Sequence, residues 1–575
     1  MRSRHNDILQ DDDEFTSLAA TSPNDHNYQF YYHQPGSPYD GLGYGALFTL
    51  DNANLYSNQR GGAAIDNLGK IRDNFSFDRA ADQLTRPGLT HNGDQVYHQP
   101  VALTYSFLTQ SALNRIGQTG DGDKGLQPLT QAAQAQALKS MQAWADVANV
   151  TFTEAASTDI NHRADITFAY FTQRADGSTA AGSGPNAINA YAYYPPSAKP
   201  GSDNAFAGTV WFNKNFATHQ APVSGDFSSQ TFTHELGHAL GLAHPGSYDA
   251  SLGNPSYQND AAYYQDSLQY SIMSYFNAGY TGADTKGVYG YGPMVDDIAA
   301  IQKLYGANMS TRTGDTVYGF NSNTGRDFLT ATADNGKPVN FAVWDAGGND
   351  TLDFSGYSQQ QMINLNDGAF SSVGGGTQNV AIARGAIIEN AIGGSGRDVI
   401  IGNDQDNLLA GNAGSDILYG GLGADHLWGG KDANNFTDYF VYLNAKESTV
   451  AAFDVIEDFE HGIDKIDLSG LRFNNSLSEL RFIDSGSAFS GQKGEIQLNF
   501  DAFNGTTDLL MNTQSNSYAA DFKIHVVGQV EQSDICLPEV MKGKEKRAER
   551  PFFYGWAAAE LSATKEPVVT SPERR

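Results

Sequence analysis

The residues best suited to bind a metal ion lie in one eleven-residue run, HELGHALGLAH, which begins at His234. On a helix, residues four apart lie on the same face, so His234 and His238 can present two imidazoles to one metal ion. Glu235 lies beside them and can act on a metal-bound water. Gly241 lets the helix end and the chain turn back, which brings His244 round as a third ligand. Three protein ligands that leave a position for water are typical of a catalytic zinc site.

A nine-residue repeat forms a second pattern, GGSGRDVII, GNDQDNLLA, GNAGSDILY and GGLGADHLW, which begins at Gly393. It matches the repeat of calcium-binding parallel β-helices, in which six residues turn and three form a strand. Glycine adopts the backbone conformation that the turn requires, and the sixth position supplies a carboxylate. Backbone carbonyl oxygens complete an oxygen cage for calcium. The second repeat has Asn407 at that position, so its site is either weaker or uses Asp404 instead.

The eleven-residue run resembles the zinc motif of the metzincin metalloproteases, which pair it with a downstream Met-turn. The segment SIMSY at 271–275 fits that turn, and by resemblance Met273 forms an apolar floor beneath the imidazoles. Together with DDIAAIQKLYGAN at 296–308, these motifs resemble the serralysin subfamily specifically. The resemblance implies that Tyr275 ligates zinc in the resting enzyme, swings away during turnover and then stabilises the oxyanion.

These residue types define a reaction. Zinc lowers the pKa of a bound water to about 7 and polarises the scissile carbonyl. Glu235 accepts the proton of the attacking water and passes it to the leaving amine. Zinc and Tyr275 hold the tetrahedral oxyanion. We therefore expect a zinc-dependent endopeptidase that hydrolyses protein substrates.

Further calcium ligands are implied by the resemblance to serralysins. The unit WDAGGNDTL at 344–352 has the character of the repeats, and Glu389 and the carbonyls around 312–316 would complete its site. The expected calcium ligands are Arg312, Gly314, Thr316, Asp345, Gly347, Gly348, Asp350, Glu389, Gly394, Gly396, Asp398, Asp404, Gly411, Gly414, Asp416, Gly421, Gly423 and Asp425. One catalytic zinc ion and several structural calcium ions are the expected cofactors.

The motifs divide the 575 residues into four expected parts. Residues 1–60 read as a leader or pro-segment, whose removal for activation is implied by the family. Residues 61–310 are expected to form an α+β metzincin-like protease domain. We expect residues 311–536 to form an all-β calcium-binding domain, a parallel β-roll and β-sandwich with closing strands. The basic tail at 537–575 departs from the family and is expected to be disordered.

Helices and strands must position the metal motif. A helix is expected over 131–147, with Leu138, Met141, Ala145 and Val147 largely on one face. A second helix from Ser229 carries the motif. Short strands are expected at 150–154, 164–170 and 208–213. The strand around 208–213 is expected to be the sheet edge along which an extended peptide adds as a further strand.

Charge and composition exclude several classes of protein. The chain has 65 acidic against 36 basic residues, a net charge of −29, so a sequence-independent nucleic-acid binder is excluded. One cysteine cannot form an internal disulfide, and no apolar run approaches the roughly 18 residues of a membrane span. In a cytosol low in calcium the carboxylates of the repeats repel one another, and calcium outside the cell folds them.

The resemblance also implies where the protein works and with what. Serralysins leave Gram-negative cells by a one-step, type I route, so we expect a secreted, extracellular protein, monomeric in solution. The expected partners are protein or peptide substrates, the type I secretion machinery and a small protein inhibitor. Two alternatives stay open: a calcium-dependent, adhesin-like module on an inactive protease scaffold, and a metallohydrolase that acts on something other than a peptide.

Overall fold

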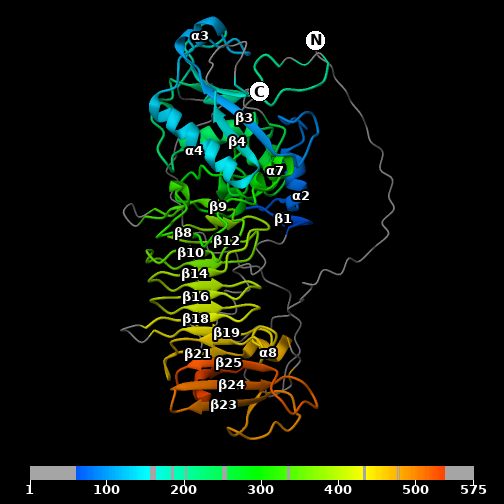
Figure 1. Cartoon of the computed structure of the whole chain (residues 1–575), viewed down its shortest axis with the longest axis vertical. Coiled ribbons are helices and arrows are strands. Elements are labelled where there is room, and N and C mark those ends of the chain that lie inside the picture. Colours follow the sequence, from blue (N-terminus) through cyan, green and yellow to red (C-terminus); the bar gives the residue numbers. More distant parts are fainter. Residues whose placement is uncertain are drawn as a thin grey trace, which may run out of the picture.

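The computed structural model describes residues 60–537 except 156–163, 183–186, 201, 203, 249–254, 333–336, 432–435, 475–476 and 478–479. The expected pro-segment, apart from Arg60, and the expected basic tail, apart from Leu537, lie outside the described residues. The molecule is elongated (Figure 1). We call the described residues up to 310 the head and those from 311 onward the roll.

The head is built on a five-stranded sheet in the order β4-β3-β5-β7-β6. Its strands are β3 Val101–Phe107, β4 Val150–Glu154, β5 Ile166–Phe171, β6 Ala190–Ala192 and β7 Thr209–Asn213. The strands are parallel except β6, which runs antiparallel to β7. The three strands expected here all exist, but the expected edge position of β7 is wrong. It lies between β5 and β6 and is buried throughout, as an interior strand is, so β6 forms the edge.

The helices of the head include the two expected ones. They are α2 Phe77–Leu84, α3 Gln110–Ile116, α4 Gln131–Val147, α5 Phe227–Ala239, α6 Tyr257–Asp260 and α7 Val295–Tyr305. Helix α4 spans the predicted residues, and the Thr130 side chain caps it by accepting from the Ala133 N–H. The expected apolar face of α4 is partly wrong, because Leu138 is 43 % exposed. The face is set instead by Trp144, whose Nε1 donates to the Thr233 carbonyl of α5.

The roll consists of short strands stacked along the long axis of the molecule (Figure 1). Its two long sheets have the orders β22-β23-β24-β25-β20-β18-β16-β14-β10-β8 and β11-β15-β17-β19-β21-β26, and a third, short sheet has the order β12-β13-β9. From β14 to β21 the chain alternates between the two sheets at every strand, and these pairings are parallel. The central residues Ile400, Leu409, Leu418 and Leu427 are at most 1 % exposed, so they point inward as expected.

The remaining bounds complete the description. Within the roll the strands are β8 Val317–Gly319, β9 Phe341–Val343, β10 Thr351–Asp353, β11 Met362–Asn364, β12 Phe370–Ser371, β13 Val380–Ile382, β14 Asn390–Ile392, β15 Val399–Ile401, β16 Leu408–Ala410, β17 Ile417–Tyr419, β18 His426–Trp428, β19 Tyr439–Val441, β20 Asp454–Ile456, β21 Lys465–Asp467, β22 Arg481–Phe482, β23 Glu495–Asp501, β24 Thr506–Asn512, β25 Phe522–Val527 and β26 Ile535–Cys536. Helix α8 covers Ser469–Asn474, and β1 Ala63–Ile65 pairs with β2 Ile71–Asp73 in the head. No described helix is both long and apolar enough to cross a membrane.

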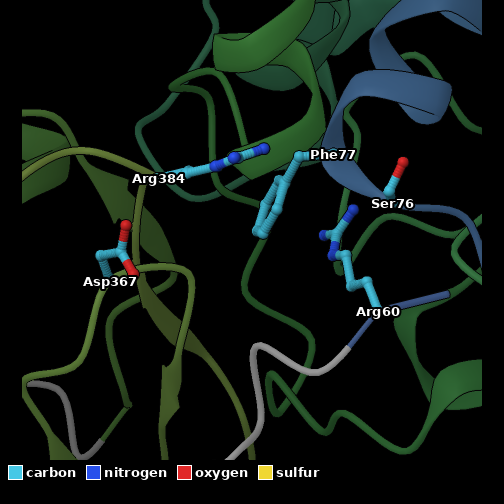
Figure 2. A pocket seen from close by; sticks show the side chains of 5 residues that line it. All are labelled: Arg60, Ser76, Phe77, Asp367 and Arg384. Atoms are coloured by element: carbon cyan, nitrogen blue, oxygen red, sulfur yellow. The ribbon is translucent and has the colours of Figure 1, made fainter. Parts of the chain in front are cut away.

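Head and roll share one buried apolar cluster, which runs from Phe77 to Ile535. Across their junction, Asp146 of α4 forms ion pairs with Arg312 and Arg326 of the roll. A pocket of about 240 Å³ also lies at the junction, where the Phe77 ring stands between Arg60 and Arg384 (Figure 2). The pocket contains none of the predicted site residues.

Candidate active site and calcium-binding turns

Helix α5 carries the metal motif and is positioned at both ends. The Asp226 side chain caps its first turn by accepting from the Ser229 N–H at 2.7 Å. The helix ends at Ala239, and Gly241 adopts a φ of +111°, which disfavours any residue with a side chain. A Cβ at Gly241 would also stand 2.3 Å from the Leu89 carbonyl oxygen. The chain therefore reverses here and returns His244 to the other histidines.

The structure brings His234, His238 and His244 together, with one ligand atom of each within 4.8 Å of the others. Each Nδ1 lies against a carbonyl oxygen: that of Ile272 at 2.6 Å, Leu242 at 2.7 Å and Tyr248 at 3.2 Å, respectively. Because a carbonyl can only accept, each Nδ1 carries the proton and each Nε2 is left as a lone-pair donor.

This donor set fits a zinc ion. The Nε2 atoms of His238 and His244 are 3.0 Å apart. Two nitrogen lone pairs at that separation repel each other unless a cation lies between them. A tetrahedral zinc ion, with Zn–N bonds of about 2.0–2.1 Å, would separate two ligand nitrogens by roughly 3.3 Å.

The other two predicted residues of the centre lie close to it. Glu235 follows His234 on α5 and is fully buried. The ring centroid of Tyr275 lies 4.4 Å from that of His244 and 6.1 Å from that of His234. Tyr275 is thus beside the histidines, where its role as ligand or oxyanion donor remains a prediction.

Met273 lies under the histidine helix, as the Met-turn resemblance implies. It is fully buried, and a Cβ added at Gly237 would stand 2.6 Å from its Sδ. The missing side chain at Gly237 therefore gives Met273 its place against α5.

Sequence reasoning missed Asp297, a buried carboxylate that holds the Met-turn. One oxygen accepts from Ser271 Oγ at 2.6 Å, and the other accepts from the N–H groups of Ile272 and Met294. Burial raises the pKa of Asp297 to about 7. The Ile272 carbonyl accepts from His234, so Asp297 positions this histidine through the turn. The sequence pattern at 296–308 indicates the family but not this role of Asp297.

A second missed carboxylate, Asp266, supports the opposite side of the centre. Its Oδ1 accepts from Tyr248 Oη at 2.7 Å and from Ser274 Oγ at 2.8 Å, and burial raises its pKa to about 7. The Tyr248 carbonyl accepts from His244 Nδ1. No sequence pattern marks Asp266, because its partners come together only in the folded chain.

The first predicted calcium cluster gathers at the top of the roll. Asp350 Oδ1 accepts from the Thr316 N–H, Glu389 accepts from the Asp350 N–H, and Asp345 accepts from the Gly347 N–H. A Cβ at Gly348 would meet the Gly314 carbonyl oxygen at 2.7 Å, so this carbonyl faces the cluster. The Arg312 side chain points elsewhere and binds Asp146 and Tyr318 Oη, which leaves only its backbone for the predicted role.

The sixth-position side chains of the repeats (Asp398, Asn407, Asp416 and Asp425) belong to two columns of polar side chains, one along each long sheet of the roll. Column one is Asp398, Asp416, Asp438 and Asp464, and column two is Asp350, Glu389, Asn407, Asp425 and Asp454. In column one the N–H of each member donates to a carboxylate oxygen of the next, at 2.7–3.2 Å. Asp438 was missed because 22 residues, not 18, separate it from Asp416, and the insertion hides the repeat.

The predicted turn glycines admit backbone carbonyls from the neighbouring turn. Gly414, Gly421 and Gly423 all have positive φ values, between 101° and 131°. A Cβ at these positions would stand 2.0–2.5 Å from the carbonyl oxygens of Gly396, Asn403 and Gln405, respectively. Gly394 donates its N–H to Asp398, and a Cβ at Gly411 would stand 2.4 Å from Asp416 Oδ2.

The columns fit a hard cation. Asp350 Oδ2 and Asp425 Oδ2 are buried and accept no hydrogen bond from the described residues. Burial raises the pKa of Asp425, and that of Asp398 in the other column. Buried carboxylate oxygens beside backbone carbonyls are a donor set that calcium prefers. Asp404, in contrast, is exposed, while Asn407 occupies the buried column position.

Known proteins resemble the chain over nearly all of this structure. A family model for the C-terminal part of serralysins of the M10 peptidases matches residues 307–537, and the matrixin model matches residues 124–275. The chain is 50 % identical over 483 residues to Serralysin B of Dickeya chrysanthemi, which covers 84 % of this chain and 94 % of that protein. It is 46 % identical over 470 residues to Metallopeptidase AprA of Pseudomonas marginalis, with 81 % and 91 % covered. Serralysin of Proteus mirabilis is 43 % identical over 476 residues, with 80 % and 92 % covered.

Proposed function

The chain belongs to the serralysin family of metalloendopeptidases, and on that premise we propose that it hydrolyses protein substrates at a zinc ion held by His234, His238 and His244. The observation that carries the proposal is the convergence of three imidazoles whose Nδ1 atoms are all bound to carbonyl oxygens. Their Nε2 lone pairs are thereby directed to one point.

The residues around the centre divide the chemical work. Zinc, when bound, supplies a Lewis acid for the scissile carbonyl and makes its bound water acidic. Glu235 takes the proton of that water and returns it to the leaving amine. Tyr275 donates its hydroxyl hydrogen to the oxyanion. The edge strand β6 offers backbone groups to which an extended peptide can add as a further strand.

The same proposal assigns the roll to calcium, through the carboxylates of the two columns and the carbonyls beside them. It treats residues 1–60 as a removable pro-segment, 61–310 as the protease domain and 311–536 as the calcium-dependent domain. Secretion by a type I route follows from this division, because a calcium-free roll can cross such a channel unfolded. A small protein inhibitor that binds the same active site remains a prediction.

Casein hydrolysis by the purified protein tests the proposal. Glu235→Gln should lower kcat/KM by about 10²–10⁴-fold, because the general base is lost, while the zinc content stays unchanged. Glu154→Gln makes the same chemical change on the exposed face of β4 and should leave activity unchanged. If wild type and Glu235→Gln cleave casein alike with zinc bound, the protease mechanism is wrong. If zinc-loaded wild type cleaves no protein, the adhesin or non-peptide alternative takes its place.

A further inference from the structure

One step of column two departs from the regular pattern of the roll. Elsewhere in that column, a backbone N–H donates to the carboxylate of the next member: Asp350 to Glu389, Asn407 to Asp425, and Asp425 to Asp454, at 2.7–3.0 Å. Between Glu389 and Asn407 the direction is reversed. Here the Asn407 side-chain Nδ2 donates to the Glu389 carbonyl oxygen at 2.8 Å.

The hydrogen-bonding capacity of Asn407 is used within its own turn and the one before it. An amide nitrogen carries two hydrogens and has no lone pair for a metal. One hydrogen goes to the Glu389 carbonyl and the other to Asn403 Oδ1 at 2.9 Å, while Asn407 Oδ1 accepts from the Asn403 N–H at 2.8 Å. Asn407 is only 2 % exposed, so water does not compete for these bonds.

The next member of the column, Asp425, shows what a carboxylate does at the same position of the repeat. Its Oδ1 accepts from the Asn407 N–H, but its Oδ2 is buried without a donor among the described residues. Neither Asp425 nor Asp398 has an ion pair with Lys or Arg in the described part of the chain. A carboxylate at this position therefore needs a cation to balance its charge. The amide of Asn407 needs none, because its N–H already binds the Glu389 carbonyl oxygen.

We propose that no calcium ion binds between Glu389 and Asn407, because the hydrogen bond from the Asn407 amide to the Glu389 carbonyl takes its place. Column two then holds two separate groups of calcium ions. The upper group lies around Asp350 and Glu389, and the lower group begins at Asp425. The inference rests on the calcium binding assigned to the roll above. It also resolves the two expectations for the second repeat, because neither a weaker site at Asn407 nor a substitute ligand at the exposed Asp404 is needed.

Asn407→Asp tests the inference, because it replaces the donor nitrogen by an oxygen that faces the Glu389 carbonyl. At limiting calcium, the lowest concentration at which the wild-type roll is folded, these oxygens repel, so the melting temperature should fall below that of wild type. In millimolar calcium the deficit should be recovered, and calorimetric titration should count one more bound calcium ion per chain. Gln492→Glu is the control, since it makes the same amide-to-carboxylate change at an exposed position of the same roll, outside both columns. It should add no ion.

Asn407→Ala decides the matter even where the charged variant does not fold. It removes the amide without adding charge, so it should lower the melting temperature equally at limiting and at millimolar calcium and lose no calcium ion. The inference is overturned if Asn407→Ala loses an ion, or if a folded Asn407→Asp binds no more calcium than wild type and Gln492→Glu. A wild-type protein that binds no calcium at all overturns the calcium part of the proposed function as well, which separates the two failures.

Discussion

The buried carboxylates of the head and those of the roll are satisfied in different ways. In the head, the two oxygens of Asp297 accept three hydrogen bonds between them, and Asp266 is bound by Tyr248, Ser274 and the Ala262 N–H. In the roll, Asp350 and Asp425 each accept one backbone N–H and bury the second oxygen without a donor in the described residues. An unsatisfied buried oxygen is costly. The head therefore satisfies Asp297 and Asp266 by its own donors, whereas Asp350 and Asp425 of the roll rely on an external cation.

Calcium removal should have the largest effect. We expect EGTA to unfold residues of about 340–470, because the charges of the columns are then uncompensated and the metal's binding free energy is lost from folding. Circular dichroism should record the loss of β structure, and re-added calcium should restore it. Magnesium at the same concentration is the control, since it demands tighter octahedral geometry. An unchanged spectrum in EGTA would contradict the contrast between head and roll.

Asp297→Asn should destabilise the head whether or not calcium is present. The substitution turns one carboxylate oxygen into an NH₂ group. It therefore removes either Oδ2, which accepts two backbone N–H groups, or Oδ1, which accepts from Ser271. The expected cost is about 1–3 kcal/mol. Activity should fall with it, because the Met-turn and His234 are displaced. Urea unfolding and casein hydrolysis measure the two effects. A cost that appears only in calcium would place Asp297 with the carboxylates of the roll.

The effect of Asp425→Asn on the melting temperature should differ in sign between limiting and millimolar calcium. At limiting calcium, where the folded roll still has empty sites, it removes an uncompensated buried charge and should raise the melting temperature or leave it unchanged. In calcium it removes a ligand, and the melting temperature should fall by several degrees, as for a loss of about 1–2 kcal/mol. Differential scanning calorimetry under both conditions makes the comparison. The same sign in both would show that Asp425 is not a calcium ligand.

The smallest effect is a pH dependence. Burial raises the pKa of Asp464 from an ordinary 3.8 to about 6, so the folded, calcium-free chain binds protons more tightly than the unfolded chain. The stability contributed by this group is complete below about pH 4 and is lost as the pH rises through about 6. At limiting calcium, where the roll is folded but some sites are empty, the melting temperature should therefore fall between pH 5 and pH 8. In saturating calcium this fall should be smaller, and an equal fall in both conditions would refute the assignment.

The sequence predicted what local patterns can encode. The bounds of α4, the histidine motif on α5, the inward apolar residues of the roll and the two-part fold follow from spacing and turn chemistry. The resemblance to serralysins was confirmed by the family models and relatives. Glycine and aspartate at fixed intervals were sufficient because each repeat contacts mainly its neighbours.

Long-range pairing accounts for what the sequence did not predict. Strand β6 has only three residues, and its pairing with β7, which displaces β7 from the sheet edge, is a property of sheet order. Asp266 and Asp297 act through residues that meet only in the folded head. Asp438 was hidden by an insertion within its repeat, and Leu138 is exposed because Trp144 sets the packing of α4 against α5.

Hydrogen exchange followed by mass spectrometry tests the contrast between head and roll most directly. Head and roll share one apolar cluster, so independent behaviour is not guaranteed by the packing. In EGTA, we expect the amides of strands β14–β18 to exchange at the rates of an unfolded chain, while those of α5 and β5 keep their protection. Loss of protection in head and roll together, or in neither, would contradict the account.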